Sequence, residues 1–209
     1  MSHFKIFIAL FLFFFTLASQ AEMASKEPAK GVTKSAAPYQ GYSDWNFEFS
    51  YVSWKEQMTL TNGPTTDHAY SDFIGNALAV EFEHYFVPRW GLIAELSFMS
   101  GKASLGGSQT QLIYQQSNVS WTGKEVSLRG AYRFSSSIIS SVGPLVLNRQ
   151  ITIPPDPNGS NVTSGANVNY GLIADVRLKL DRHWEFRQTI GTLVQNAKTY
   201  WALAVGYAY

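Results

Sequence analysis

Residues 200–209 read YWALAVGYAY, and their side chains alternate in size. The large apolar members of this stretch are Trp201, Leu203, Val205, Tyr207 and Tyr209, and the small ones are Ala202, Ala204, Gly206 and Ala208. Successive side chains of a β-strand point to opposite faces of the sheet. The stretch therefore predicts a strand with one apolar face and one nearly empty face.

The same alternation recurs from residue 44 onward, at about ten residues per segment, which is the length of a strand that crosses a membrane in a barrel. In the first segment, Trp45 and Phe47 alternate with polar side chains such as Glu48. The eight segments are 45–52, 77–86, 90–98, 125–134, 138–153, 167–180, 184–195 and 200–209. We predict an all-β fold, an eight-stranded antiparallel up-and-down transmembrane β-barrel. Pro144 cannot donate a ladder hydrogen bond, so we expect a bulge or a local break there.

The connections between these segments alternate in length. Those after the second, fourth and sixth segments are short, whereas those after the first, third and fifth are long and polar, at about 53–75, 101–121 and 154–165. Outer-membrane barrels have short periplasmic turns and longer external loops, so we expect both termini on the periplasmic side. Aromatic residues gather at the predicted periplasmic strand ends, as an interfacial girdle requires: Trp45, Phe86, Trp90, Phe134, Trp184 and Tyr209.

The N-terminus has the layout of a secretory signal peptide. Lys5 precedes an apolar run over residues 6–18, which is shorter than a spanning helix needs, and Ser19-Gln20-Ala21 offers a small-residue cleavage site, with Ala18 as an alternative. We therefore predict a signal peptide over 1–21, a flexible periplasmic leader over 22–43 and an outer-membrane β-barrel over 44–209. Export in this way predicts the outer membrane of a Gram-negative bacterium.

Composition excludes several chemistries. The chain has no cysteine, so it can form no disulfide, thiolate metal site or cysteine nucleophile. Its formal net charge of +1 gives no indication of nucleic-acid binding. No cluster of His, Asp or Glu has a metal-ligand spacing, and we expect neither a metal nor a cofactor.

The polar face of the predicted strands carries many charges, which in a membrane barrel would line the lumen. Buried charges are costly unless paired, so we predict an ion-pair network there. Glu95 and Arg129 fall at similar height on neighbouring strands, and Asp175 and Arg177 adjoin the strand of Arg187 in the same way. The predicted network comprises Glu48, Glu81, Glu83, Glu95, Glu125, Arg129, Arg133, Asp175, Arg177, Lys179, Glu185 and Arg187. Side chains roughly fill an eight-stranded barrel, which disfavours an open pore.

A soluble, lipocalin-like barrel is the alternative, with the apolar face turned inward around a ligand. Too many large side chains would then compete for the interior. The small face of residues 200–209 fits the inside better, where space is short.

Strand number, loop asymmetry, a charged lumen, the girdle positions Trp90 and Trp184 and the terminal Tyr209 together resemble the small eight-stranded outer-membrane barrels, OmpA/OmpX-like or OmpW-like, over residues 44–209. The resemblance implies outer-membrane lipid and lipopolysaccharide as surroundings. It also implies that the last strand is an assembly signal read by the barrel-assembly machinery, carried by Trp201, Leu203, Val205, Tyr207 and Tyr209.

Three functions compete. The first is a structural or surface-interaction role in which the long external loops meet an extracellular partner, and the second is a narrow ion or small-solute channel of OmpW-like type. The third, a lipid-A-modifying enzyme, needs a His with a Ser and an acid. His68 has Ser71 and Asp72 nearby in sequence but lacks a His-x-Ser-Asn-like signature, and His84 shares the lipid-facing parity, so we predict no enzyme activity.

Overall fold

The computed structural model describes residues 40–62, 65–106, 118–153, 163–164, 167–194 and 197–209. The predicted signal peptide and nearly all of the predicted leader lie outside these residues. No helix in the described part of the chain is long and apolar enough to cross a membrane. Every regular element there is a β-strand, which confirms the all-β prediction.

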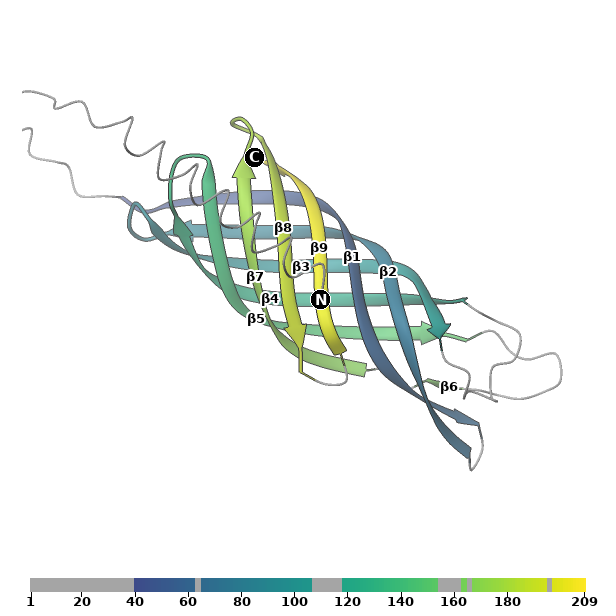
Figure 1. Ribbon diagram of the computed structural model, residues 1–209. Helices are drawn as coiled ribbons and strands as arrows, with labels where there is room; N and C mark the ends of the chain where they lie inside the picture. The colour runs from purple at the N-terminus through teal and green to yellow at the C-terminus, as the bar shows by residue number, and fades with distance from the viewer. Residues whose placement is uncertain (1–39, 63–64, 107–117, 154–162, 165–166, 195–196) are drawn as a thin grey trace, which may run out of the picture.

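Eight long strands close into one antiparallel barrel (Figure 1). Each strand pairs with its neighbours in the sequence, and β1 pairs with both β2 and β9, which closes the ring. The short β6 is an addition that pairs with β1 outside this ring order. The strands are β1 Tyr42–Asn62, β2 Thr65–Tyr85, β3 Trp90–Gly106, β4 Asn118–Arg133, β5 Ile138–Thr152, β6 Thr163–Ser164, β7 Asn167–Lys179, β8 Trp184–Leu193 and β9 Ala197–Ala208. The predicted eight-stranded up-and-down barrel is thereby confirmed.

The apolar faces of the strands point outward and the charged faces point inward. Phe47 and Leu78 are 55% and 65% exposed, whereas Glu48, next to Phe47 in the chain, is buried. Large apolar side chains form an exposed belt around the barrel, with aromatic residues at the end that carries the short turns 86–89, 134–137 and 180–183. This orientation rules out the lipocalin-like alternative, because its apolar face would have to point inward.

The prediction of an external loop over residues 53–75 is wrong. β1 continues to Asn62 and β2 begins at Thr65, so most of this segment is a long β-hairpin that projects beyond the other strands (Figure 1). The alternation continues past the belt, but there the apolar side chains point inward and the polar ones outward, as Trp54 and Lys55 do. Beyond the belt the outer face carries polar side chains, so the sequence there lacks the pattern of a membrane-spanning strand.

The second predicted loop, 101–121, is too long for the same reason. β3 extends to Gly106 and β4 starts at Asn118, with Ala103, Val119 and Trp121 buried on the inner face. Of the third predicted loop, residues 154–162 lie outside the described part of the chain, and residues 163–164 form β6. The strands are therefore up to 21 residues long, about twice the predicted length.

Pro144 produces a local break without a bulge. The β4–β5 ladder pairs Ser127 with Leu145 and Gly130 with Val142 in one constant register, and the pairs between them are missing. On its other side β5 pairs with β7 without interruption through Pro144. The proline thus costs ladder contacts toward β4 while the register of the fifth strand is preserved.

Candidate functional site in the barrel lumen

The inward side chains form successive layers along the barrel axis. On β1 they run from Glu48 through Ser50 to Val52 and Trp54, and then to Glu56, all buried. We call these the charged layer, around Glu48, and the apolar layer, around Trp54. A third group, the end layer, lies at the short-turn end and consists of Tyr42, Tyr85 and Arg133.

Arg129 on β4 is one centre of the charged layer. Its Nη2 atom lies 2.6 Å from Oε2 of Glu81 and 2.6 Å from Oε2 of Glu95. Its Nη1 atom donates to Oδ2 of Asp175 at 2.5 Å. One guanidinium therefore joins β2, β3 and β7 to β4, and its fork of donors suits this multiple pairing.

Glu81 on β2 is the matching acidic centre. Besides Arg129, it contacts Arg177 through Oε1 at 2.6 Å and Arg187 through Oε2 at 3.1 Å. Arg187 also pairs with Glu48 and, at 2.5 Å, with Glu95. All these groups are buried, and a buried charge without a partner is strongly destabilising. The stability of the layer therefore depends on these ion pairs.

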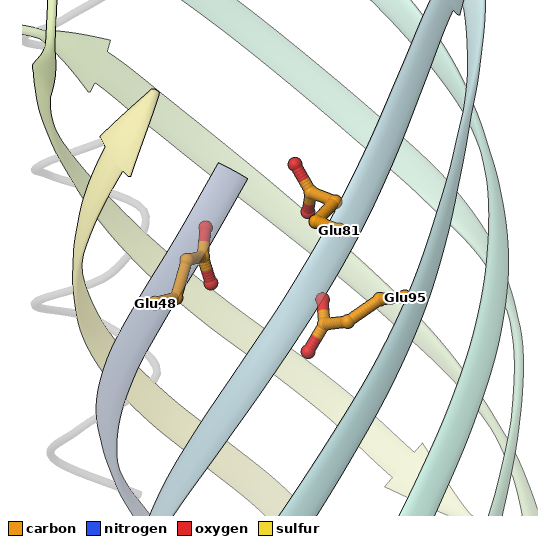
Figure 2. Close-up of side chains that lie close together, drawn as sticks. All are labelled: Glu48, Glu81 and Glu95. Carbon is orange, nitrogen blue, oxygen red and sulfur yellow. The ribbon is translucent and has the colours of Figure 1, made fainter. Parts of the chain in front are cut away.

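Three carboxylates of this layer converge from adjacent strands (Figure 2). Glu48, Glu81 and Glu95 each offer an oxygen within 4.8 Å of the others, a spacing that could hold a metal ion. Arg187, however, is paired with all three of them. The guanidinium already supplies the positive charge that a metal would bring, so the group is the acidic side of an ion-pair network.

Every predicted lumen residue points into the barrel, but not all pair as expected. Glu95 and Arg129 are in contact, whereas Asp175 bonds to Arg129 and Ser141 rather than to the strand of Arg187. Lys179 pairs with Glu83 at 3.1 Å, and Glu185 lies 3.1 Å from Arg177. Glu125 forms no ion pair within the described residues; the Tyr200 hydroxyl donates a hydrogen bond to it.

The end layer closes the barrel at the short-turn end. Tyr42 and Tyr85 stack with centroids 5.5 Å apart, and the Arg133 guanidinium lies 4.0 Å from the centroid of the Tyr85 ring. The Tyr42 hydroxyl donates to Glu83 at 3.0 Å, which joins this layer to the charged one.

The apolar layer was not predicted. Trp54 stacks on Phe73 at 4.9 Å and meets the edge of Trp121 at 4.8 Å, and Tyr200 lies 6.3 Å from Trp54. These rings form the centre of a buried apolar cluster that also contains Val52, Met99, Leu145, Leu147, Ile173 and Leu193. The inward parity of Trp54, continued from Glu48, was the signal that could have revealed it.

Sequence reasoning also missed a second buried ion pair, beyond the apolar layer. Arg149 donates through Nε to Oε2 of Glu56 at 2.8 Å and through Nη2 to Oε1 of the same carboxylate. Glu56 also accepts from Trp54 Nε1 at 3.2 Å, and the Arg149 guanidinium lies 4.9 Å from the Phe73 ring centroid. The pair holds the aromatic side chains of the apolar layer in place.

A cavity of about 10 Å³ lies between the charged and apolar layers, among Glu95, Glu125, Tyr200 and their neighbours. This is room for about one water molecule. The lumen is therefore filled by side chains rather than open to solutes at this level.

Two of the candidate catalytic residues, Ser71 and Asp72, point to opposite faces of β2. Ser71 is buried on the inner face of β2, while Asp72 is exposed on the outer face and pairs with Lys55 at 3.0 Å. The His68 side chain lies outside the described part. His84, at the short-turn end, contacts Ser43, with the Ser43 Oγ and His84 Nδ1 atoms 2.8 Å apart on the outer face.

A closed eight-stranded barrel with an apolar belt outside and paired charges inside is the architecture of the small outer-membrane β-barrels, and this chain has it. Nothing in a scan of protein-family models or among curated proteins matches the chain.

Solved structures of similar shape include OprG from Pseudomonas aeruginosa, with a TM-score of 0.49 and 10% identity over 81% of this chain and 97% of that one. The N-terminal β-barrel domain of Pseudomonas aeruginosa OprF has a TM-score of 0.46 and 11% identity, over 81% of this chain and 100% of that one. Ail, the attachment invasion locus protein of Yersinia pestis, has a TM-score of 0.45 and 14% identity, over 80% and 99%. The architecture assigned to this chain rests on its own strand pairing.

Proposed function

We propose that this protein is an integral outer-membrane barrel that acts through its external surface and does not pass solutes through its lumen. The observation that carries the proposal is the filled lumen. The end layer, the charged layer and the apolar layer lie in series along the axis; the side chains of the charged and apolar layers are buried and contact one another, and the end layer adds Tyr85, which is buried, with the half-buried Tyr42 and Arg133. A solute would have to displace all three.

The external surface offers a projecting structure for contacts. The β1–β2 hairpin continues beyond the level at which β9 begins, since the last β1–β9 pair along β1 joins Glu56 to Ala197. β6 pairs with this hairpin at Leu60 and Thr61. Projecting segments of a rigid scaffold are common sites of recognition, so we assign partner contacts to this end of the barrel.

Export and assembly complete the proposal. Residues 1–21 act as the signal peptide, and the segment from residue 22 to the start of β1 at Tyr42 acts as a periplasmic leader, two residues shorter than the predicted 22–43. Val205 and Tyr207 on β9, and Tyr209 directly after it, are exposed at the short-turn end. Such a surface is accessible to the barrel-assembly machinery, which we propose reads this strand.

Cysteine labelling on intact cells tests the location and the orientation, because the chain has no native cysteine. Gln150→Cys places a thiol on exposed β5 above the belt, and Ser136→Cys is its match in an exposed short turn. A membrane-impermeant maleimide should label the first variant on intact cells and the second only after the outer membrane is permeabilised. Equal labelling of both, or the reverse order, contradicts the proposal.

A further inference from the structure

The outer wall of the barrel carries very few charged side chains. Among the strand residues that the structure describes, only four Lys, Arg, Asp or Glu side chains face outward: Lys55, Asp72, Lys102 and Lys124. His84 also faces outward, near the short turns. All four lie on β1 to β4. The outer faces described for β5, β7, β8 and β9 carry no such residue, so the positive charge is confined to one side of the barrel.

The three lysines lie at the edge of the apolar belt away from the short turns. Lys124 is the register partner of Phe98, the last large apolar residue of the belt on β3, and its Nζ lies 5.8 Å from the Phe98 ring centroid. Lys102 follows two outward positions further along β3. A lysine in this position lays its apolar stem on the belt and holds its ammonium group in the headgroup region.

Lys55 and Lys102 are the nearest two of these lysines. β2 alone separates them, and Lys102 lies two residues from Ser104, the β3 residue level with Lys55, so their backbones are about 12 Å apart by the usual strand dimensions. Lys124 lies four residues from Ser120, the register partner of Lys102, and its backbone is about 14 Å from that of Lys102. Ile74, the register partner of Lys102, is exposed on β2 between Lys55 and Lys102. The ion pair of Lys55 with Asp72 is highly exposed, at 70% and 48%, and such pairs are weak enough to yield to a stronger anion.

We propose that Lys55, Lys102 and Lys124, the lysine cluster, bind the phosphate groups of the phosphorylated glycolipid of the outer leaflet, lipid A. The phosphates of a lipid lie just beyond its hydrocarbon, at the height of these ammonium groups, and the exposed Ile74 contacts the upper part of the acyl chains. The inference rests on the proposed outer-membrane location. It gives the barrel one lipid-binding side, formed by β1 to β4.

Binding of fluorescently labelled diphosphoryl lipid A to the refolded protein in dodecyl maltoside micelles tests this proposal. Each lysine near a charged lipid surface contributes enough that the Lys55→Gln, Lys102→Gln, Lys124→Gln triple variant should bind on the order of 100-fold more weakly. The matched triple Lys→Arg variant keeps the charge and should bind like the wild type. Arg182→Gln, in an exposed turn at the opposite rim, should also bind like the wild type.

Two results would overturn the proposal: a triple Gln variant that binds like the wild type, or equal wild-type affinity for dephosphorylated lipid A. Equal affinity for phosphatidylglycerol would contradict the assignment to the glycolipid. Insertion of the wild type into phosphatidylcholine vesicles, followed by its heat-modifiable gel mobility, separates the two proposals. Failure to insert counts against the membrane location, whereas insertion without lipid A preference counts against the lysine cluster alone.

Discussion

Arg177 on β7 and Arg187 on β8 are direct register partners, although both carry positive charge. Like charges in this position destabilise a sheet. Glu81, on the far side of the lumen, resolves the conflict because one of its oxygens contacts Arg177 at 2.6 Å and the other contacts Arg187 at 3.1 Å. A single carboxylate thus ties opposite walls of the barrel together.

Removal of that carboxylate should be strongly destabilising. Glu81→Gln keeps the shape but leaves Arg129, Arg177 and Arg187 short of negative charge in a buried layer, a loss of about 3–5 kcal/mol in the free energy of unfolding. Urea unfolding in vesicles, followed by heat-modifiable mobility, measures it. The control Asp72→Asn breaks an exposed pair and should cost less than about 1 kcal/mol. Equal effects of the two variants would contradict the network.

The two buried ion-pair sites should act independently. Glu56 pairs with Arg149 beyond the apolar layer, whereas Glu81 pairs with Arg129, Arg177 and Arg187 in the charged layer. The losses in the free energy of unfolding caused by Glu56→Gln and by Glu81→Gln should therefore add to within about 0.5 kcal/mol in the double variant. Glu95 and Glu81 share Arg129 and Arg187, so that double variant should depart from additivity by more. A double-mutant cycle for each pair provides the measurement, and strong coupling between Glu56 and Glu81 would show that the layers are not separate.

Gly143, beside Pro144, should not tolerate a side chain. A Cβ on Gly143 would lie 2.0 Å from the Leu128 carbonyl oxygen and 2.7 Å from the Arg129 Cα, so β4 and β5 would have to separate. Gly130 is the matched control on the same ladder, since a Cβ there meets nothing closer than 3.9 Å. We expect Gly143→Ala to lower the unfolding midpoint clearly and Gly130→Ala to leave it nearly unchanged. Similar midpoints for both variants would mean that the strands are not held this closely.

Asp181, in the turn between β7 and β8, should make stability depend on pH. Hydrogen bonds from the backbone N–H groups of Trp184 and His183, both 2.7 Å long, lower the pKa of its carboxyl. A lowered folded pKa stabilises the fold above the ordinary value of about 3.9, and this contribution disappears as pH falls through the folded pKa. Asp181→Asn should therefore unfold more easily than wild type at pH 7 and equally easily in strong acid. A difference in urea midpoint that stays constant over the pH series would contradict this cause.

Within the belt, much of the fold could be predicted from the sequence. There, apolar side chains such as Phe47 face outward and charged ones such as Glu48 face inward, as the alternation predicts. Beyond the belt the polar Lys55 faces outward while Trp54 fills the interior. The sense of the alternation reverses at that level, which is why the strand extensions looked like loops.

The detailed pairing in the lumen could not be predicted from parity alone. Parity places Asp175 inside, but its partner Arg129 is on a strand that is not adjacent to β7. Contacts across a lumen depend on the stagger of the whole barrel and on side-chain reach, neither of which is local in sequence. Pairs between adjacent strands were easier to predict, as the Glu95–Arg129 contact between β3 and β4 illustrates.

Single-channel recording of the refolded, heat-modifiable protein in a planar bilayer tests the closed lumen most directly. With Trp54, Glu81 and Arg129 in place, we expect no discrete openings in symmetric salt at any concentration. Discrete current steps that grow with salt concentration would contradict it, and would show that the lumen ion pairs rearrange to form a narrow channel.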